Sequence, residues 1–538
     1  MAKKNVLTKG KKAQAERLAL GGQWAQAEPL YASVCKIDPT DAEAWAKLAA
    51  VRFRLGRHVD AESAARRALA LVPGLGFAQQ TLATILQYQG KSDEASFVLQ
   101  ERVKQQPSST EALLNLARLR ETQGHVKEAF ALYHRALDTQ PDSEYVLAKR
   151  GELLEKEGRL EDAAESAARG LAKAPLSPVL NLTAARIDRR MGRHAEAAAR
   201  LETVLDQEMA DELGMEIHLL LGQLYDRLGH EAKVLPHLLK GKRRMVMAAD
   251  PDGSRRVRFL ASCRTARSRL SDRLIATPLA APTGREETPV FLIGFPRSGT
   301  TLLEQILDSH PGLQTLDEKP MAEVMERAFL EMSGNTDDAL ADLSSEQIAA
   351  LRQVYWREAG NHVARSAGTL LVDKLPLNLT RVSLLWRVFP EAHFILAIRH
   401  PCDVVLSCLM QNFGINDAMV GYVSLENIAR IYTEVMGSWL ECVERLPLHW
   451  QRIRYEDLIT NFEPEARRLL EFIGVDWSDA VLDHTEHARQ RGIINTPSYH
   501  QVTQPIYQHA RYRWKRYESH FSEVLPLLKP FVDEFEYA

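Results

Sequence analysis

The chain has 538 residues, which is long enough for two or more domains with their own hydrophobic cores. Lys plus Arg number 68 and Asp plus Glu number 71, so the net charge of -3 gives no basic field that would favour nucleic acid as the main partner. No run of 18 apolar residues occurs, so we expect no membrane span. The five cysteines lack metal-ligand or disulfide spacing, and no apolar stretch follows the basic N-terminus, which together favour a cytoplasmic protein.

The first part of the chain repeats with a period of 34 residues. In each unit a small residue lies seven positions before a glycine, and an alanine lies five positions after it. Glycine can end a helix in a left-handed turn, small residues let two helices cross closely, and proline suits the first turn of the next helix. The positions are Gly22, Gly56, Gly90, Gly124, Gly158 and Gly192, then Ala27, Ala61, Ala95, Ala129, Ala163 and Ala197, with prolines at Pro39, Pro73, Pro107, Pro141 and Pro175.

This period and these small residues resemble the tetratricopeptide repeat. The resemblance implies an all-α solenoid over residues 1–246, in about seven units, the last of which places Gly222 and Gly229 in matching positions. Stacked repeats form a concave groove. We expect the array either to bind a protein or peptide or to act as a scaffold or dimerisation arm, so a homodimer is left open. Residues 247–286 are expected to be a helical connector and linker, and 287–538 a second domain.

The second domain opens with a short apolar run, Val290–Ile293, a turn from Gly294 to Gly299, and a helix that begins at Thr300. This order suits a phosphate-like anion, which loop amides and a helix N-terminus would bind. Three further strand candidates alternate with helical patterns, so we predict a parallel α/β sheet with its chemistry at the carboxyl ends of the strands. These candidates are Thr369–Val372, His393–Ile398 and Arg452–Arg454.

The loop matches the nucleotide-binding pattern G-x-x-x-x-G-K-[ST], except that Thr300 occupies the lysine position. Arg297 provides a positive charge instead, and Ser298, Thr300 and Thr301 add hydroxyl groups. The strand His393–Ile398 leads into Arg399 rather than an acidic magnesium ligand. We therefore expect an anion bound without a metal, and a kinase is the less favoured interpretation.

The run Pro296-Arg-Ser-Gly-Thr-Thr-Leu302 resembles the 5′-phosphosulfate loop of sulfotransferases, above all the protein-tyrosine and heparan branches. This resemblance implies the donor 3′-phosphoadenosine-5′-phosphosulfate, no metal, and a phosphate-loop-like sulfotransferase fold. The stretch from Phe394 to Ser407 resembles the family's 3′-phosphate site. Cofactor contacts are thereby implied for Arg297, Ser298, Gly299, Thr300, Thr301, Arg399, Ser407, Tyr455 and Arg513.

The same resemblance implies three catalytic residues. Glu318 would be the general base, with the adjacent Asp317 left open, and Lys374 in Val372-Asp-Lys-Leu-Pro376 would stabilise the transition state. Ser498, in a C-terminal segment that resembles the family's closing lid, would lie near the sulfuryl group. In one departure from the family, Gln411 stands where tyrosine sulfotransferases carry an arginine.

These residues predict in-line sulfuryl transfer to an acceptor hydroxyl, with a protein or peptide tyrosine favoured. A carbohydrate or small-molecule hydroxyl stays open as the acceptor, as does a repeat scaffold whose second domain binds a nucleotide but is inactive. Each single residue also has an ordinary structural explanation, such as a surface carboxylate for Glu318 or a core aromatic for Tyr455. His310, His400, His500 and His509 are expected to be structural or peripheral.

Overall fold

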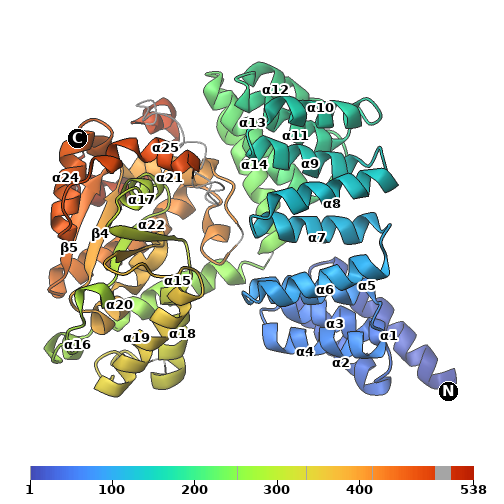
Figure 1. Ribbon diagram of the computed structural model, residues 1–538, viewed down its shortest axis with the longest axis horizontal. Helices are drawn as coiled ribbons and strands as arrows, with labels where there is room; N and C mark the ends of the chain where they lie inside the picture. Colours follow the sequence, from blue (N-terminus) through green and yellow to red (C-terminus); the bar gives the residue numbers. More distant parts are fainter. Residues whose placement is uncertain (1, 251, 335, 415, 491–510, 538) are drawn as a thin grey trace. The chain divides into compact units, whose positions relative to one another are not determined.

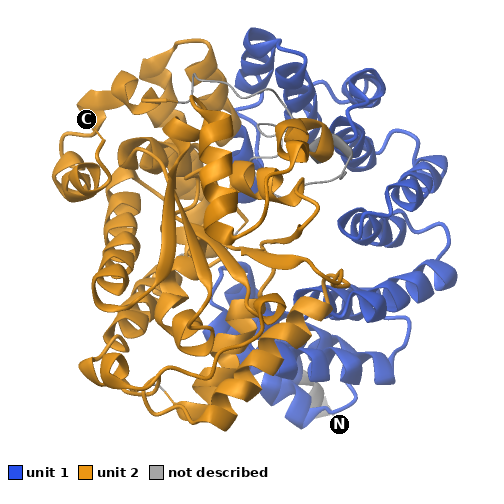
Figure 2. Ribbon diagram, turned by 60° about the vertical axis from the view of Figure 1, so that its left-hand side comes forward, with its two compact units in different colours: residues 1–217 blue, residues 218–538 orange. Residues whose placement is uncertain are grey.

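A computed structural model describes residues 2–250, 252–334, 336–414, 416–490 and 511–537. The chain divides into two compact units, residues 1–217 and 218–538 (Figure 2). This division falls inside a helix, and the boundaries predicted at residues 246 and 286 stay predictions. Among the described residues, none of the helices combines the length and apolarity needed to cross a membrane.

Unit 1 is built only from helices, which follow one another as antiparallel pairs (Figure 1). The predicted helical repeat is confirmed: all six glycines of the 34-residue register have left-handed φ angles of 73–79°. The small residues before them are buried where the two helices of a pair cross. The helices are α1 Ala2–Leu20, α2 Trp24–Ile37, α3 Ala42–Arg54, α4 His58–Leu71, α5 Gly76–Tyr88, α6 Ser92–Gln105, α7 Thr110–Thr122, α8 Val126–Thr139, α9 Glu144–Lys156, α10 Leu160–Leu171, α11 Pro178–Arg190, α12 His194–Glu202 and the first part of α13 Asp211–Arg227.

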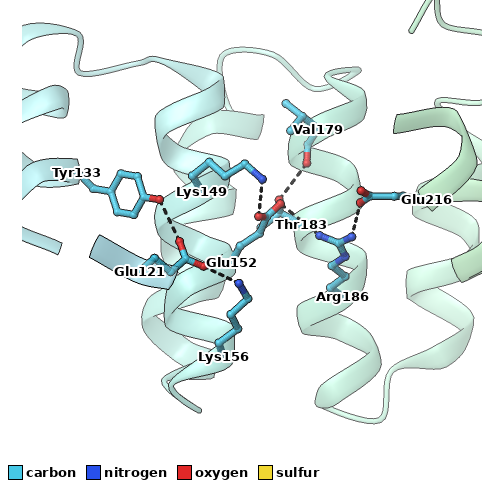
Figure 3. Close-up of polar contacts among 9 residues, drawn as sticks. All are labelled: Glu121, Tyr133, Lys149, Glu152, Lys156, Val179, Thr183, Arg186 and Glu216. Atoms are coloured by element: carbon cyan, nitrogen blue, oxygen red, sulfur yellow. Dashed lines mark hydrogen bonds and ion pairs between the residues drawn. The ribbon is translucent and has the colours of Figure 1, made fainter. Parts of the chain in front are cut away.

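Charged side chains of α9, α11 and α13 pair with one another in unit 1 (Figure 3). Lys149 donates to Glu152 at 2.6 Å, Arg186 donates to Glu152 at 3.2 Å, and Arg186 also pairs with Glu216. Burial works against the charged form of Glu152, but the two cations outweigh it and lower the pKa of this carboxyl. The four charges sum to zero, so they favour neither an acidic nor a basic partner.

Unit 2 contains a five-stranded parallel sheet in the order β2-β3-β1-β4-β5, which confirms the predicted α/β architecture. The strands are β1 Val290–Gly294, β2 Leu313–Asp317, β3 Leu370–Lys374, β4 His393–Ile398 and β5 His449–Arg454. The strand order reverses between β1 and β4, and ligands bind open α/β sheets in the crevice at such a reversal. The loop after β1 and Arg399 after β4 both lie at that end of the sheet.

Helices cover both faces of this sheet (Figure 1). Apolar residues of α17 and α24 pack on one face with Leu292 and Ile395. On the other face Phe291 stacks on Phe394 with ring centres 5.3 Å apart, next to Tyr355 of α19. The remaining elements of unit 2 are α14 Glu231–Ala249, α15 Ser254–Ser268, α16 Asp272–Ala276, η1 Arg285–Glu287, α17 Thr300–Asp308, α18 Met321–Ser333, α19 Ser345–Gly360, η2 Pro376–Arg381, α20 Val382–Val388, α21 Pro401–Met410, η3 Met419–Gly421, α22 Leu425–Arg445, α23 Tyr455–Leu458, α24 Phe462–Ile473, η4 Asp479–Asp483, α25 His484–Gln490, η5 Arg513–His520 and α27 Leu525–Glu534.

The segment between the predicted domains is fixed to unit 2 by arginines. Arg255 and Arg258 of α15 both pair with Asp417, at 2.8 and 2.9 Å. Farther along, Arg387 donates to the carbonyl oxygen of Pro278 at 2.7 Å and Arg352 donates to that of Ala281 at 2.9 Å. Residues 277–289 therefore form a strap on the surface of unit 2.

The sequence prediction omitted the edge strand β2. Its residues Leu313-Gln-Thr-Leu-Asp317 mix apolar and polar side chains, and only part of the strand is buried. Pairing with β3, from Leu313 beside Leu370 to Asp317 beside Lys374, stabilises it. This pairing brings the residue after β2, Glu318, to the carboxyl end of the sheet.

A methyl group at Gly294 should destabilise unit 2, because its Cβ would lie 2.6 Å from the backbone oxygen of Ala397. We expect Gly294→Ala to lower the free energy of unfolding by about 1–3 kcal/mol, as overpacking does. Gly360→Ala at the end of α19 is the matched control, since nothing lies within 4 Å of its Cβ. Thermal unfolding of the full chain measures both, and equal effects of the two variants would contradict the close approach of β1 and β4.

Candidate active site

The loop between β1 and α17 turns through two left-handed residues. Arg297 has a φ of 74° and Gly299 a φ of 100°. A non-glycine residue in this conformation is strained, and such strain is concentrated at functional sites. The turn leads directly into the N-terminus of α17, where backbone amides and the helix dipole favour an anion. The local geometry therefore agrees with the predicted anion-binding loop.

Three hydroxyl-bearing residues of this loop, Ser298, Thr300 and Thr301, are buried. Tyr455, the first residue after β5, packs against the loop so closely that a Cβ at Gly299 would lie 2.9 Å from its ring. Glycine is thus required at 299 for two reasons, its φ and its contact with Tyr455. The structure brings these predicted cofactor contacts together at the carboxyl ends of the central strand β1 and the edge strand β5.

Arg297 connects the loop to α21. Its Nε donates to Ser407 Oγ at 3.1 Å, and Cys408 Sγ contacts the carbonyl oxygen of Pro296 at 3.3 Å. The residues predicted to bind the two phosphate-bearing ends of the donor are therefore adjacent, although 110 positions separate them in the sequence. The sequence spacing of Arg297 and Ser407 does not by itself indicate this contact.

Arg399 is nearly buried at the end of β4. Its guanidinium carbon lies 5.1 Å from the centre of the Tyr455 ring, and its Nη2 lies 3.7 Å from Asp403 Oδ2. The aromatic face and the carboxylate both stabilise a buried cation. A guanidinium held in this way at the carboxyl end of a strand suits bidentate binding of phosphate oxygens.

Lys374, the last residue of β3, is completely buried between two carboxylates. Its Nζ lies 3.0 Å from Glu318 Oε1 and also contacts Asp317 Oδ1. Burial disfavours the ammonium, but Asp317 and Glu318 outweigh burial and raise the pKa of Lys374 above its ordinary value. Glu318 has a φ of 52° and donates its backbone N–H to the carbonyl oxygen of Lys374 at 2.8 Å. Its side chain keeps 42% of its surface exposed, whereas the side chain of Asp317 keeps 17% exposed.

A further carboxylate near Lys374 was absent from the sequence prediction. Glu304 of α17 is buried, accepts a hydrogen bond from Thr315 Oγ1 at 2.7 Å and contributes to the raised pKa of Lys374. Glu304 lies on a helix with ordinary amphipathic patterning, so no motif indicates it. The charge of Lys374 is therefore balanced by side chains from β2, α17 and the loop after β2.

Of the two C-terminal residues predicted for the site, the structure describes Arg513 but not Ser498. Ser498 and the rest of the expected lid lie outside the described residues. Arg513 pairs with Asp226 of α13. Its Nε is buried and has no hydrogen-bond partner within the described ranges, which leaves a donor for an anion. A cofactor contact for Arg513 stays a prediction, while Asp226 is a partner that the sequence did not indicate.

His400 lies inside an aromatic cluster formed partly by the C-terminal residues. Its ring is stacked on Trp514 with ring centres 5.2 Å apart, and the ring of Tyr537 is also 5.2 Å away. Its Nδ1 accepts a hydrogen bond from the backbone of Cys402 at 3.2 Å, which caps α21. Burial lowers the pKa of His400 to about 4, and Lys515 and Arg399 add to this effect. The neutral ring is thus structural, as expected.

Acid should destabilise the protein through His400. Between its ordinary pKa of about 6.5 and about 4, the unfolded chain binds a proton that the folded chain rejects, so stability falls as the pH drops through this window. The loss is of the order of 2–3 kcal/mol. Melting temperatures from pH 7.5 to 4.5 measure it. His400→Asn should flatten the profile, whereas His520→Asn, at an exposed histidine, should not; identical slopes in all three proteins would refute the assignment.

Comparison with known proteins finds a family match in each part of the chain. Residues 289–479 match the family model described as "Sulfotransferase family", and residues 13–75, 81–144 and 182–232 match "Tetratricopeptide repeat". A tetratricopeptide repeat protein of known structure from Parabacteroides merdae is 15% identical and covers 44% of this chain and 93% of its own, with a TM-score of 0.37 that is too low to support an inference.

Curated relatives match the sulfotransferase part at modest identity. An uncharacterized protein of Aquifex aeolicus is 29% identical over 261 residues, 46% of this chain and 33% of that protein. Protein-tyrosine sulfotransferase 1 of Danio rerio is 28% identical over 42% of this chain and 65% of its own length. Protein-tyrosine sulfotransferase 2 of Gallus gallus is 28% identical over 43% of this chain and 64% of its own length. The chain thus spans between a third and two-thirds of these relatives; it matches the tetratricopeptide-repeat model in its first part and the sulfotransferase-family model in its second, and the second part is similar to protein-tyrosine sulfotransferases.

Proposed function

We propose that the protein transfers the sulfuryl group of 3′-phosphoadenosine-5′-phosphosulfate to an acceptor hydroxyl, and that the acceptor is a tyrosine of a protein or peptide. The observation that carries the proposal is the exposed Glu318 carboxylate 3.0 Å from the buried Lys374 ammonium, at the same end of the sheet as the anion-binding loop. A base and a fixed cation side by side are what sulfuryl transfer to a hydroxyl requires.

The residues present fit the donor. The glycine-shaped loop with Arg297 and Thr301 suits the 5′-phosphosulfate, and Arg399 with Ser407 suits the 3′-phosphate. The buried Arg513 Nε, which has no acceptor in the described part of the chain, provides one further donor. When bound, the donor molecule supplies an activated sulfuryl group. The side chains of this chain supply the proton acceptor and the positive charges.

Glu318 accepts the proton of the acceptor hydroxyl as the new oxygen–sulfur bond forms and the sulfur–oxygen bond to the 5′-phosphate breaks. Lys374 and Arg297 are placed to stabilise negative charge that develops on the sulfuryl and bridging oxygens. Asp317 keeps the Lys374 ammonium charged and oriented. Ser498 is assigned to the same group of stabilising side chains by its resemblance to the family.

The acceptor class rests on the relatives named protein-tyrosine sulfotransferases and on the repeat array. Tetratricopeptide repeats are modules for protein interaction, so we infer that this array recruits the acceptor protein or a partner that delivers it. The homodimer and the cytoplasmic location stay predictions.

Glu318→Gln should lower turnover by about 10²–10⁴ because it removes the proton acceptor. Binding of 3′-phosphoadenosine-5′-phosphate should not change. Sulfonate incorporation into tyrosine peptides, oligosaccharides and phenols, followed by mass spectrometry, measures turnover and identifies the acceptor class. Glu331→Gln, at an exposed carboxylate on α18, is the control. Near wild-type turnover in Glu318→Gln would exclude this residue as the base, and sulfonation of sugars alone would exclude tyrosine as the acceptor.

Arg399→Ala should weaken binding of 3′-phosphoadenosine-5′-phosphate by about 10- to 100-fold, because charge-assisted hydrogen bonds to a phosphate are lost. Arg430→Ala removes an exposed arginine of α22 that pairs only with its own helix in the described structure, and it should bind normally. Calorimetry with this nucleotide and with ATP–magnesium tests the donor class. Binding of ATP–magnesium alone would indicate a kinase-like protein, and binding of neither a scaffold.

A further inference from the structure

The helical pair α13–α14 contacts the elements assigned to the donor nucleotide. Gln223 Nε2 of α13 donates to the carbonyl oxygen of Met410 at 2.7 Å, and Lys242 Nζ of α14 donates to that of Gln411 at 2.8 Å. Met410 is the last residue of α21 and Gln411 follows it, so neither carbonyl oxygen has a hydrogen-bond partner inside that helix. The two side chains therefore fix the last turn of α21, which begins at Ser407.

Among the described residues, Lys242 and Lys374 are the two buried lysines. Lys242 is 1% exposed, and its ammonium lies 5.9 Å from the centre of the Phe413 ring in addition to its hydrogen bond to Gln411. Burial lowers its pKa to about 8. A buried ammonium is costly unless it makes good contacts, so its placement at the end of α21 indicates a specific role. It brings a positive charge to Gln411, the position where this chain lacks the family's arginine.

Asp226 of α13 organises the segment that follows the expected lid. It is buried and accepts hydrogen bonds from Arg513, from Arg516 at 2.7 Å and from Tyr517 at 2.5 Å. Next to Arg513, the backbone N–H of Trp514 donates to Asp403 at 2.9 Å.

Asp403 in turn lies 3.7 Å from Arg399. Hence Asp226 is linked through this segment to Arg513 and Arg399, two of the three arginines assigned to the nucleotide.

The repeat register supports a special use of these positions. Gln223 and Asp226 lie six and three residues before Gly229, the turn glycine of the last unit. Arg186 and Glu152 lie six residues before their own turn glycines, Gly192 and Gly158. In those units the position carries charges that pair within the array, whereas in the last unit it contacts α21.

We propose that Gln223, Asp226 and Lys242 are positioning residues of the donor-nucleotide site, so that the last repeat unit forms part of the sulfotransferase unit. Gln223 and Lys242 hold α21 and with it Ser407, and Asp226 orients Arg513. The proposal rests on the function proposed above. It predicts that a change on the repeat side alters affinity for the nucleotide and leaves affinity for the acceptor unchanged.

Calorimetry of the full chain with 3′-phosphoadenosine-5′-phosphate tests this role. Asp226→Asn and Lys242→Met should each raise Kd by about tenfold, the effect of one lost positioning hydrogen bond. Lys240→Met, which changes an exposed lysine on the same helix, should bind like the wild type. In steady-state assays the donor KM should rise in the two variants while the acceptor KM stays constant. A merely structural defect that leaves part of the protein persistently misfolded would lower the stoichiometry but leave the Kd of the folded fraction unchanged.

Wild-type Kd values in Asp226→Asn and Lys242→Met would overturn the inference while leaving the proposed function intact. A wild-type protein that does not bind the nucleotide would instead refute the proposed function. If Lys242→Met fails to fold, Gln223→Ala decides the question for α21, because it removes one neutral hydrogen bond. A Kd in Gln223→Ala equal to that of the wild type would then count against the inference.

Discussion

The Lys374 ammonium has no exposed surface, and the arrangement of the site follows from the need to balance its charge. A buried cation is tolerated only where carboxylates and hydrogen bonds replace water. Asp317 and Glu318 can do so because β2 pairs with β3 in a register that places Asp317 beside Lys374. The left-handed φ of Glu318 then turns its carboxylate toward the same ammonium while leaving it accessible to solvent. Strain in the backbone and burial of charge are therefore two parts of one arrangement.

Features encoded by local conformational rules could be predicted from the sequence. The six turn glycines of the repeats have the left-handed conformation that their spacing indicates, and the loop from Gly294 to Thr301 follows a buried strand and begins a helix as expected. In both cases the residue type itself carries the information, because only glycine adopts such a φ without strain. Arg297, which adopts it without being glycine, is an exception that no propensity predicts.

Features that depend on tertiary contacts could not be predicted. The strand β2 has no strong pattern of its own, and pairing at the edge of the sheet stabilises it. Glu304 is indistinguishable in sequence from any polar residue on an amphipathic helix, yet its burial near Lys374 makes it part of the electrostatics of the site. Likewise, the hydrogen bond from Arg297 to Ser407 joins residues that only the parallel order of β1 and β4 brings together.

The last repeat unit shows why a regular pattern can conceal a second role. Its turn glycine Gly229 and its crossing glycine Gly222 obey the same packing constraints as those of the earlier units. These constraints leave other positions of the helix pair free to vary, and Gln223, Asp226 and Lys242 occupy such positions. A buried carboxylate that accepts bonds from two arginines and a tyrosine, and a buried lysine at the end of α21, are costly choices for a scaffold. The cost of burying these side chains is understandable if they hold Arg513 and Ser407 in place for an anionic ligand. The end of the repeat array would then contribute to ligand binding at the carboxyl end of the sheet.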